Sequence, residues 1–359
     1  MPVPSPDTDH PKKATSIIGG MFGLEPAFHS QEGSPPFLTG SELLLNNGRS
    51  CIWMLVNLLR PPQVWVPSYL CPEGIVAAID TSETVLRFFE VDRDLNIPSD
   101  RWVSEVSQGD LVIFIDYFGL PFDRQRAIDV KKNGAWVVED ACQALLSGYV
   151  GKSSDFAFFS LIKWIGVPDG GILRFPESAP MNGASLEAPQ PAWWLKALEA
   201  SVLRREFDDG LPTRDRWFKL FREAEDTMPI GPYAMSQMSQ TIMKYSVDYE
   251  FVAKRRGDNY RGLLAKLADF AIFPDIEPGI VPLGFPVRVK NRDAIRQTLF
   301  DHHIYPPVHW DIDGVVPPRY EDSHQLSRQI MTLPCDQRYG PEDMERMIKV
   351  FMRAVQQHT

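Results

Sequence analysis

The middle of the chain alternates short apolar runs with stretches of helical periodicity. Helices are predicted at residues 51–59 and 72–79. Strands are predicted at the apolar runs 64–66, 85–89, 111–115, 135–138, 156–159 and 171–175. The last two runs have no helix between them, which indicates a short reversal of the sheet. Short, continuously apolar strands separated by helices are typical of a mostly parallel sheet sandwiched by helices.

After residue 176 the pattern is mostly helix and loop. A polar loop at 177–191 precedes helices predicted at 192–207, 214–225 and 235–267, the last interrupted near Gly257. A smaller α/β unit is then indicated by strands at 280–283 and 285–289, a helix at 292–302 and a final helix opened by Gly340. That helix places apolar side chains at i, i+3, i+4 and i+7: Met344, Met347, Ile348 and Phe351. We therefore expect an α/β protein with an N-terminal extension at 1–36, a large domain at 37–245 and a small C-terminal α/β domain at 246–359.

Composition narrows the class of protein. The chain has 359 residues, with 37 Lys or Arg against 47 Asp or Glu and a net charge of −10. This balance argues against binding to nucleic acid or to an anionic membrane, which needs clustered cations. No apolar run approaches the roughly 18 to 20 residues of a membrane span, and the first residues are polar and Pro-rich. We expect a cytoplasmic protein with a frayed start.

The cysteine and histidine residues show no metal or disulfide pattern. The four cysteines, Cys51, Cys71, Cys142 and Cys335, lie far apart with no C-x-x-C pair. The seven histidines are dispersed apart from His302 and His303, and adjacent residues do not share a helix face. We expect neither a disulfide framework nor a metal site.

Three segments carry candidate chemistry. The first is the turn Gly48-Arg49-Ser50, which opens the helix at 51–59. Free amides at a helix start favour a phosphate, and Ser50 and Arg49 add a hydroxyl and a charge. The same residues also fit a plain Asn/Gly helix cap. The second is Glu139-Asp140, where an apolar strand ends at the edge at which open α/β sheets hold ligands. A carboxylate there could equally be a helix cap.

The third segment places Lys163 in strongly apolar surroundings, seven residues before Gly170. Burial lowers the pKa of an amine and frees its lone pair for Schiff-base chemistry, whereas a lysine that extends to solvent would have no such role. Together, a phosphate cradle, a strand-end Asp140 and a buried lysine match the needs of pyridoxal 5′-phosphate (PLP). That cofactor needs its phosphate held, its ring nitrogen paired with an anion and its aldehyde bonded to a lysine.

The sequence resembles the DegT/DnrJ/EryC1/StrS family of PLP-dependent sugar aminotransferases. The similar segments are NNGRS at 46–50, VWVPSYLCP at 64–72, DYFGLPFD at 116–123, VVEDACQA at 137–144, FSLIKWIGVPDGG at 159–171, MSQMSQ at 235–240, YPPVHW at 305–310 and LPCDQRYGPEDM at 333–344. They run in family order across about 300 residues. The resemblance implies the aspartate-aminotransferase-like fold (PLP fold type I), PLP as cofactor and a homodimer.

The resemblance also implies roles for single residues. Lys163 would bond to the cofactor and move the proton, Asp140 would pair with the ring nitrogen, and Gln143 would lie near the ring hydroxyl. The other expected cofactor contacts are Gly48, Arg49, Ser50 and Ser160 at the phosphate, and Tyr69 or Cys71 on the ring face. His309 would approach the substrate, although a purely structural histidine fits that position as well.

Three departures from the family pattern mark a divergent branch. The phosphate turn reads Asn47-Gly48-Arg49 instead of Ser-Gly-Thr, and Ser160 stands three residues before the lysine instead of five. The usual Asn-Arg pair before MSQMSQ, which reaches into the partner subunit's site, reads Tyr233-Ala234. The resemblance therefore does not specify the acceptor.

The expected function is transfer of an amino group from an amino acid, glutamate above all, to a keto-sugar that is nucleotide-linked, in surface polysaccharide or secondary-metabolite synthesis. A PLP-dependent sugar dehydratase or lyase is the first alternative, although related dehydratases replace the lysine. A degenerate, non-catalytic member is the second. A nicotinamide oxidoreductase is disfavoured because no G-x-G-x-x-G follows an early strand.

Overall fold

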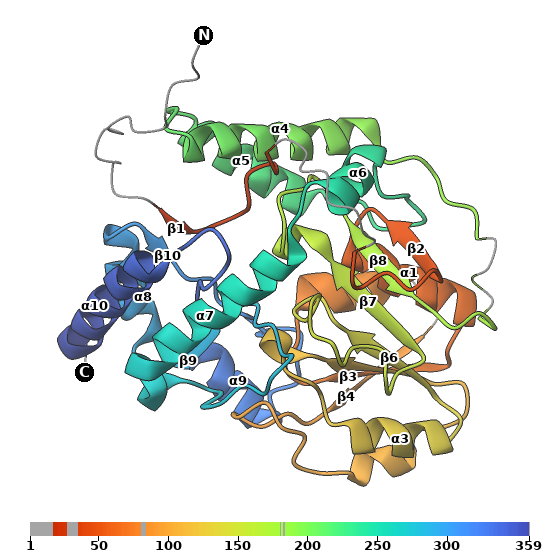
Figure 1. Ribbon diagram of the computed structural model, residues 1–359. Coiled ribbons are helices and arrows are strands. Elements are labelled where there is room, and N and C mark those ends of the chain that lie inside the picture. Colours follow the sequence, from red (N-terminus) through yellow and green to blue (C-terminus); the bar gives the residue numbers. More distant parts are fainter. Residues whose placement is uncertain (1–16, 27–34, 80–83, 180, 182–183, 359) are drawn as a thin grey trace.

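The computed structural model describes residues 17–26, 35–79, 84–179, 181 and 184–358. The expected frayed start at residues 1–16 and part of the expected 177–191 loop lie outside the described residues. The described chain is a mixed α/β protein with a seven-stranded sheet and a second group of helices and short strands built mainly from the C-terminal part (Figure 1).

The large sheet has the strand order β2-β8-β7-β6-β5-β3-β4. Its strands are β2 (Glu42–Leu45), β3 (Gln63–Pro67), β4 (Val85–Phe89), β5 (Leu111–Ile115), β6 (Trp136–Asp140), β7 (Phe156–Ser160) and β8 (Gly171–Arg174). Strands β3, β4, β5, β6 and β7 are parallel to one another. Strand β8 runs antiparallel to β7, and β2 runs antiparallel to β8. The mostly parallel sheet and its short reversal are therefore confirmed. The edge strand β2 was not predicted.

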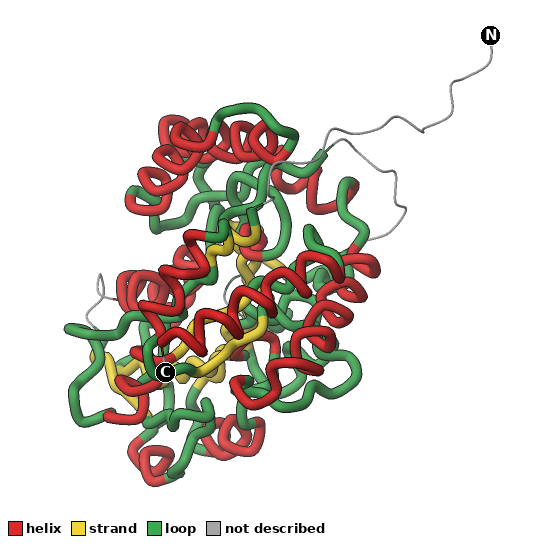
Figure 2. Tube along the Cα trace, turned by 90° about the vertical axis from the view of Figure 1, so that its left-hand side faces the viewer, coloured by secondary structure: helices red, strands yellow, loops and turns green. Residues whose placement is uncertain are grey.

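Burial explains why the central strands read as apolar runs. All five residues of β5 and of β7 are buried, as expected for strands covered on both faces. Figure 2 shows the strands in the middle of the molecule with helices around them. Helix α1 (Gly48–Leu59) packs on β7 and β8, and α3 (Arg124–Lys132) packs on β6. The short α2 (Ala77–Ile79) follows a π-helical turn at Pro72–Val76.

Two long helices lie across one end of the molecule. Helices α4 (Pro191–Asp208) and α5 (Arg214–Asp226) pack against each other at the top of Figure 1. Trp193, Ala197 and Ala224 form a small buried cluster between them. Proline at the first position of α4 fits its fixed φ and missing amide. The chain then reaches the sheet, where the Met235 amide donates to the Leu44 carbonyl of β2, and helix α6 (Gln237–Tyr245) follows.

The C-terminal elements form a second apolar core. They are α7 (Tyr249–Leu267), β9 (Phe285–Arg288), α8 (Arg292–Asp301), β10 (Ile304–Tyr305), α9 (Glu321–Gln329), β11 (Ile330–Leu333) and α10 (Pro341–His358). Strands β9 and β11 are antiparallel, and β10 pairs in parallel with β1 (Ile18–Gly19) from the chain start. Ile18 is buried in this core with Phe285, Met347 and Phe351. The expected division into domains at residues 36 and 245 remains a prediction.

Two predicted elements are wrong in detail. The helical stretch predicted at 235–267 breaks at residues 246–248 and not near Gly257, because the Asp248 side chain accepts from the Phe251 amide and starts α7 there. Residues 280–283 are not a strand. The Val281 amide donates to Ser147 Oγ and the Leu283 amide to the Phe118 carbonyl, so this segment bonds to loops and not to a neighbouring strand.

Gly171 lets β8 pass against the turn before α1, and we expect it to tolerate no side chain. A Cβ there would lie 2.2 Å from the Asn47 carbonyl oxygen, a backbone atom that cannot move aside easily. Gly171→Ala should lower the free energy of unfolding by about 3 kcal/mol, the upper end of the usual cost of overpacking. Urea unfolding measures the change. Gly148→Ala is the control, because a Cβ at Gly148 meets nothing within 4 Å, and equal stability of the two variants would contradict the prediction.

Candidate active site

The candidate residues gather where parallel strands end. Asp140 is the last residue of β6 and Ser160 the last of β7, and Asp140 pairs in register with Phe158 on β7. Lys163 is the third residue after β7 and the last of a single 3₁₀ turn, Leu161–Lys163. The carboxyl edge of a parallel sheet is the usual ligand edge of open α/β folds, so this placement agrees with the sequence-based expectation for Asp140 and Lys163.

Lys163 is electrostatically coupled to several of the predicted residues. Burial and the charge of Arg49 lower the pKa of Lys163, whereas Cys142, Asp140 and Cys71 raise it. The net result is a pKa above the ordinary value for lysine. The expectation of a lowered lysine pKa is therefore wrong for the cofactor-free protein. Burial also raises the pKa of the Cys142 thiol well above its ordinary value. Asp140 is thus the anion that holds the proton on Lys163 at neutral pH.

The two strand-end carboxylates face different surroundings. Adjacent residues of a strand point to opposite faces. Asp140 Oδ1 accepts from the Cys142 amide at 3.0 Å, and burial raises its pKa while the Lys163 charge lowers it. Glu139 Oε2 accepts from the Gly151 amide at 2.6 Å and from Ser154 Oγ at 2.8 Å. Asp140 is therefore the carboxylate available to a ligand beside Lys163, and Glu139 serves a loop.

The turn before α1 is a helix cap that is followed by Arg49 and Ser50. Asn47 Oδ1 accepts from the Ser50 amide at 2.9 Å, so the cap alternative is present in the structure. Ser50 is fully buried, and its Oγ accepts from the Gly231 amide at 3.2 Å. Gly48 lies against the turn that follows Asp140, since a Cβ at Gly48 would be 3.3 Å from Cys142 Sγ in that turn. Arg49 is half-buried and acts on Lys163.

Gln143 offers a buried donor with no partner. Its Oε1 accepts from the Phe118 amide at 2.7 Å, whereas its Nε2 has no hydrogen-bond partner among the described residues. An unpaired buried amide donor is costly, so a ligand oxygen at this position would stabilise the site. Ser160 is 6% exposed, and its hydroxyl makes no capping bond to the turn that follows.

The structure separates the two candidates for the ring face. Tyr69 is fully buried, with its ring centroid 5.6 Å from that of Trp310 and 6.0 Å from that of Tyr117. Cys71 is half-buried and electrostatically coupled to both Lys163 and Asp140. Cys71 is therefore the residue near the lysine, and Tyr69 packs in an aromatic cluster.

His309 is brought to Lys163 from the C-terminal part of the chain. Its Nδ1 lies 2.8 Å from Thr332 Oγ1, and its ring meets Phe118 edge-on at 5.7 Å between centroids. Burial, together with the positive charge of Lys163, lowers the pKa of His309 to about 3. The imidazole is therefore neutral at physiological pH, and it can accept or donate a hydrogen bond without adding charge.

Sequence reasoning missed several contacts around these residues. The 229–234 segment covers the turn before α1, because the Pro229 carbonyl accepts from Asn47 Nδ2 at 2.8 Å and the Tyr233 carbonyl accepts from the Asn46 amide at 2.9 Å. Asp169 accepts from the Ser236 amide at 2.7 Å and from its hydroxyl at 2.6 Å, which ties the lysine loop to the start of α6. The serines of MSQMSQ were the signal for this second contact.

The residues present fit PLP. The described residues offer an orphaned donor on Gln143, a buried carboxylate at Asp140 that is coupled to Lys163, and a helix start at Gly48. These are the hydrogen-bond donor, the anion and the phosphate contact that the ring oxygen, the ring nitrogen and the phosphate of that cofactor require. No group of three or more His, Cys, Asp or Glu side chains is placed to hold a metal ion in the part of the chain that the structure describes.

Asp116 directly follows β5, and its amide donates to the Asp140 carbonyl. We expect it to make the stability of the protein depend on pH. It is fully buried, and burial first and the charge of Glu139 second raise its pKa well above 3.8. Its stabilising contribution is present below the unfolded pKa and is lost as the pH rises through the folded pKa. Asp116→Asn keeps an acceptor for the Phe122 amide without the charge. Within that window the wild-type protein should lose about 1.4 kcal/mol per pH unit relative to the variant.

Urea unfolding of both proteins at several pH values from 4 upward (~pH 4 being near the unfolded pKa of an aspartate) measures this difference. Parallel curves for the two proteins would show that Asp116 does not carry the buried proton. Asp129→Asn is a suitable control, because Asp129 is only partly buried and its hydrogen bond to Lys132 lowers its pKa.

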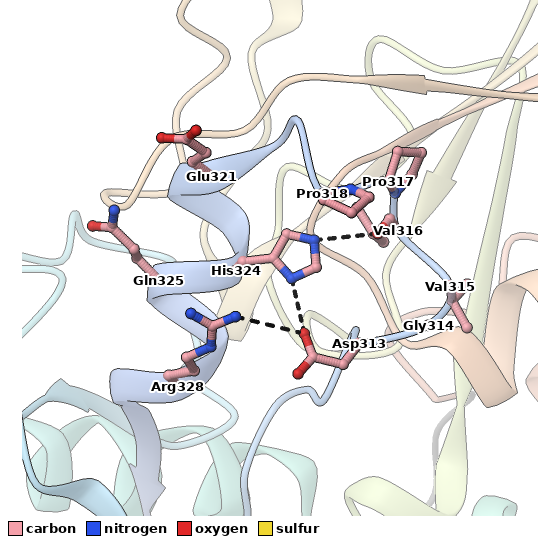
Figure 3. A pocket seen from close by; sticks show the side chains of 10 residues that line it. All are labelled: Asp313, Gly314, Val315, Val316, Pro317, Pro318, Glu321, His324, Gln325 and Arg328. Carbon is pink, nitrogen blue, oxygen red and sulfur yellow. Dashed lines mark hydrogen bonds and ion pairs between the residues drawn. The ribbon is translucent and has the colours of Figure 1, made fainter.

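A cavity of about 540 Å³ lies elsewhere, between the 313–318 loop and α9 (Figure 3). In it, His324 Nδ1 is 3.0 Å from Asp313 Oδ1 and His324 Nε2 is 3.2 Å from the Val316 carbonyl. Arg328 reaches the same carboxylate at 4.0 Å. None of the predicted site residues lines this cavity, and its polar groups hold the loop to the helix.

Among the described residues, no helix is both long and apolar enough to cross a membrane.

Comparison with known proteins shows similarity at the level of structure. No protein-family model and no curated protein sequence matches the chain. The apo form of Spr1654 from Streptococcus pneumoniae matches with a TM-score of 0.66 and 14% identity over 92% of each chain. A DegT DnrJ EryC1 StrS aminotransferase from Brucella abortus matches with a TM-score of 0.59 and 16% identity over 88% of this chain and 86% of that one.

DesI, solved in the presence of its TDP-sugar product, matches with a TM-score of 0.62 and 16% identity over 88% of this chain and 80% of its own. Spr1654 is also known in PLP and PMP forms. Similarity at these identities establishes the fold. The expected aspartate-aminotransferase-like architecture is therefore confirmed: this chain has the fold of the PLP fold type I sugar aminotransferases.

Proposed function

We propose that the protein is a PLP-dependent aminotransferase that moves an amino group from an amino acid to a keto-sugar. The observation that carries the proposal is the convergence of Lys163 and Asp140 at adjacent strand ends, beside the N-terminus of α1. The fold shared with sugar aminotransferases supports it. The same proposal includes further site residues, whereas Tyr69 belongs to the aromatic cluster with Tyr117 and Trp310. These further residues are Gly48, Arg49, Ser50, Cys71, Gln143, Ser160 and His309.

PLP, when bound, supplies an aldehyde for the lysine and a protonated ring that withdraws electrons. Asp140 would hold the proton on the ring nitrogen, and Gln143 Nε2 would donate to the ring oxygen. The N-terminus of α1 with Arg49, and the Ser160 hydroxyl, would hold the phosphate. Cys71 would cover one ring face.

Lys163 Nζ would act as the base that takes the proton from the donor Cα and returns it during transfer. A positioned acid–base group contributes about 10²- to 10⁴-fold to rate. In the cofactor-free protein the amine is protonated beside Asp140, so pairing of Asp140 with another cation would release its hold on that proton. The neutral His309 would face the substrate without repelling a cationic Lys163.

The acceptor in this proposal is a nucleotide-linked keto-sugar, and the donor is glutamate. DesI, one of the structures with this fold, was solved with a TDP-sugar product, which supports the sugar class. Surface polysaccharide or secondary-metabolite synthesis would use such a product. The proposal also includes a homodimer in the cytoplasm, and light scattering of the purified chain tests the dimer.

The test is spectroscopic. Purified protein incubated with PLP should show a visible absorbance band that glutamate bleaches and a keto-sugar restores. Transfer of nitrogen from labelled glutamate to the sugar would separate an aminotransferase from a dehydratase or lyase, which releases no amino-sugar. Protein that retains no chromophore after dialysis against PLP would refute the proposal and favour the non-catalytic alternative.

A further inference from the structure

The residue after the lysine is held by contacts with three other segments of the chain. Trp164 is fully buried, and its indole Nε1 donates to the Cys142 carbonyl at 3.0 Å. This bond joins the lysine turn after β7 to the Asp140 turn after β6. The relative placement of Lys163 and Asp140 therefore depends on where Trp164 is held.

A glutamine from the C-terminal part of the chain holds the backbone of Trp164. Gln337 Nε2 donates to the Trp164 carbonyl at 2.6 Å, and Gln337 Oε1 accepts from Arg256 Nε at 2.9 Å. Gln337 lies between β11 and α10, far from the lysine in sequence. Both ends of its amide are thus used, one on the lysine loop and one on helix α7.

A buried arginine holds the ring of Trp164. Arg256 on α7 is 0% exposed, and its guanidinium carbon lies 4.3 Å from the centroid of the Trp164 ring. Its Nη1 donates to the Leu283 carbonyl at 2.8 Å, while Nη2 has no hydrogen-bond partner among the described residues. Burial lowers the pKa of Arg256 to about 10, opposed by the charge of Asp336, so the group remains a cation at neutral pH.

A buried arginine at this position contributes little to the stability of the core. A buried, incompletely paired charge is often less stabilising than apolar side chains of the same volume. Its retention is understandable if the cation fixes an orientation. A planar guanidinium stacked on an indole and bonded to an amide restrains the ring and the backbone of Trp164 together.

We propose that Arg256 and Gln337 are positioning residues that hold Lys163 in register with Asp140 through Trp164. The inference rests on the proposed function for its catalytic meaning, but the restraint itself belongs to the protein without cofactor. Outer residues of this kind orient the groups that touch a ligand, and their loss typically costs about 10- to 100-fold in function at metal sites, the best measured case.

The main variant is Gln337→Glu. A carboxylate keeps the acceptor for Arg256 Nε and strengthens that contact, but it loses the donor to the Trp164 carbonyl. Arg256→Met removes the stacked cation, and Arg256→Lys keeps the charge without the planar stack. The matched control is Arg255→Met on the same helix, because Arg255 stacks on Phe251 and donates to the Tyr339 carbonyl, away from Trp164.

The first measurement uses cofactor-free full-length protein. Hydrogen exchange of the 161–166 segment and the rate at which an amine-reactive reagent modifies Lys163 are followed by mass spectrometry. Gln337→Glu and Arg256→Met should both exchange and react several-fold faster than wild type, with Arg256→Lys in between and Arg255→Met unchanged. Arg256→Met is informative only if it folds, whereas Gln337→Glu keeps the buried cation paired and carries the test alone.

The second measurement uses protein loaded with PLP. Gln337→Glu should shift the pH midpoint of the visible band and lower kcat by about tenfold with a smaller change in donor KM. Wild-type exchange, wild-type lysine reactivity and an unshifted midpoint in Gln337→Glu would overturn the inference, even if its thermal stability fell. Failure of wild type to bind PLP would refute the proposed function alone, because the cofactor-free measurements would still decide the positioning role.

Discussion

Lys163→Ala is expected to lower multiple-turnover amine transfer by on the order of 10⁴-fold, the upper range for a positioned acid–base group. The variant also loses the amine that bonds to the cofactor aldehyde. Reduction with borohydride should therefore fix no cofactor on the protein, whereas in wild type it should fix one on Lys163. Both losses follow from a single Nζ, because no other lysine is coupled to Asp140 in the described part of the chain.

The measurement is mass spectrometry of the reduced protein together with the rate of transfer from glutamate. Lys152→Ala is the matched control, since Lys152 is an exposed residue in the second half of the loop between β6 and β7. It should keep the reducible adduct on Lys163 and the full rate. Bleaching by glutamate and repeated turnover in Lys163→Ala would show that the lysine has been wrongly assigned.

Asp140→Asn is expected to lower kcat/KM by about 10²- to 10³-fold, the usual effect of removing one electrostatic contact to a developing charge. The amide keeps an acceptor for the Cys142 amide, so the turn should keep its shape. It cannot hold a proton on the ring nitrogen. It also removes the anion that raises the pKa of Lys163, so the amine should lose its proton at lower pH than in wild type.

The neighbouring residue supplies the control for this prediction. Glu139→Gln also removes one negative charge from β6, but from a side chain that bonds to Gly151 and Ser154. Its kcat/KM should remain near that of wild type. Titration of Lys163 reactivity against pH in the two cofactor-free variants gives a second readout. Equal losses in both variants would mean that net charge, and not the position of Asp140, matters.

Much of the fold could be predicted because the large sheet is buried on both faces. Strands β5 and β7 have no exposed side. Their residues are therefore apolar, except for Ser160 at the end of β7, and both strands stand out in the sequence. The edge strand β2 was missed for the opposite reason, since only Leu45 of its four residues is buried. Residues 280–283 are not a strand, because a short apolar run in a loop has the same sequence pattern as a short buried strand.

The candidate site was predictable where chemistry and chain order coincide. Asp140 and Lys163 lie at the ends of consecutive strands, so a strand pattern and two residue types were enough. The contacts of Trp164 with Arg256 and Gln337 could not be foreseen, because they join positions 92 and 173 residues apart through packing. The raised pKa of Lys163 was also missed, since burial and a facing carboxylate act in opposite directions and only their geometry decides the sign.

The pairing of β1 with β10 has a consequence for how the chain acquires its shape during synthesis. Ile18 and Gly19 are among the first described residues made, yet their partners are Ile304, Tyr305 and the Tyr339 hydroxyl, which are made about 300 residues later. The large sheet can close before that point, because its strands all precede residue 175. Strand β1 must therefore wait for its strand partner until residues 304 and 305 have been made, and contacts of such long range are slow to form.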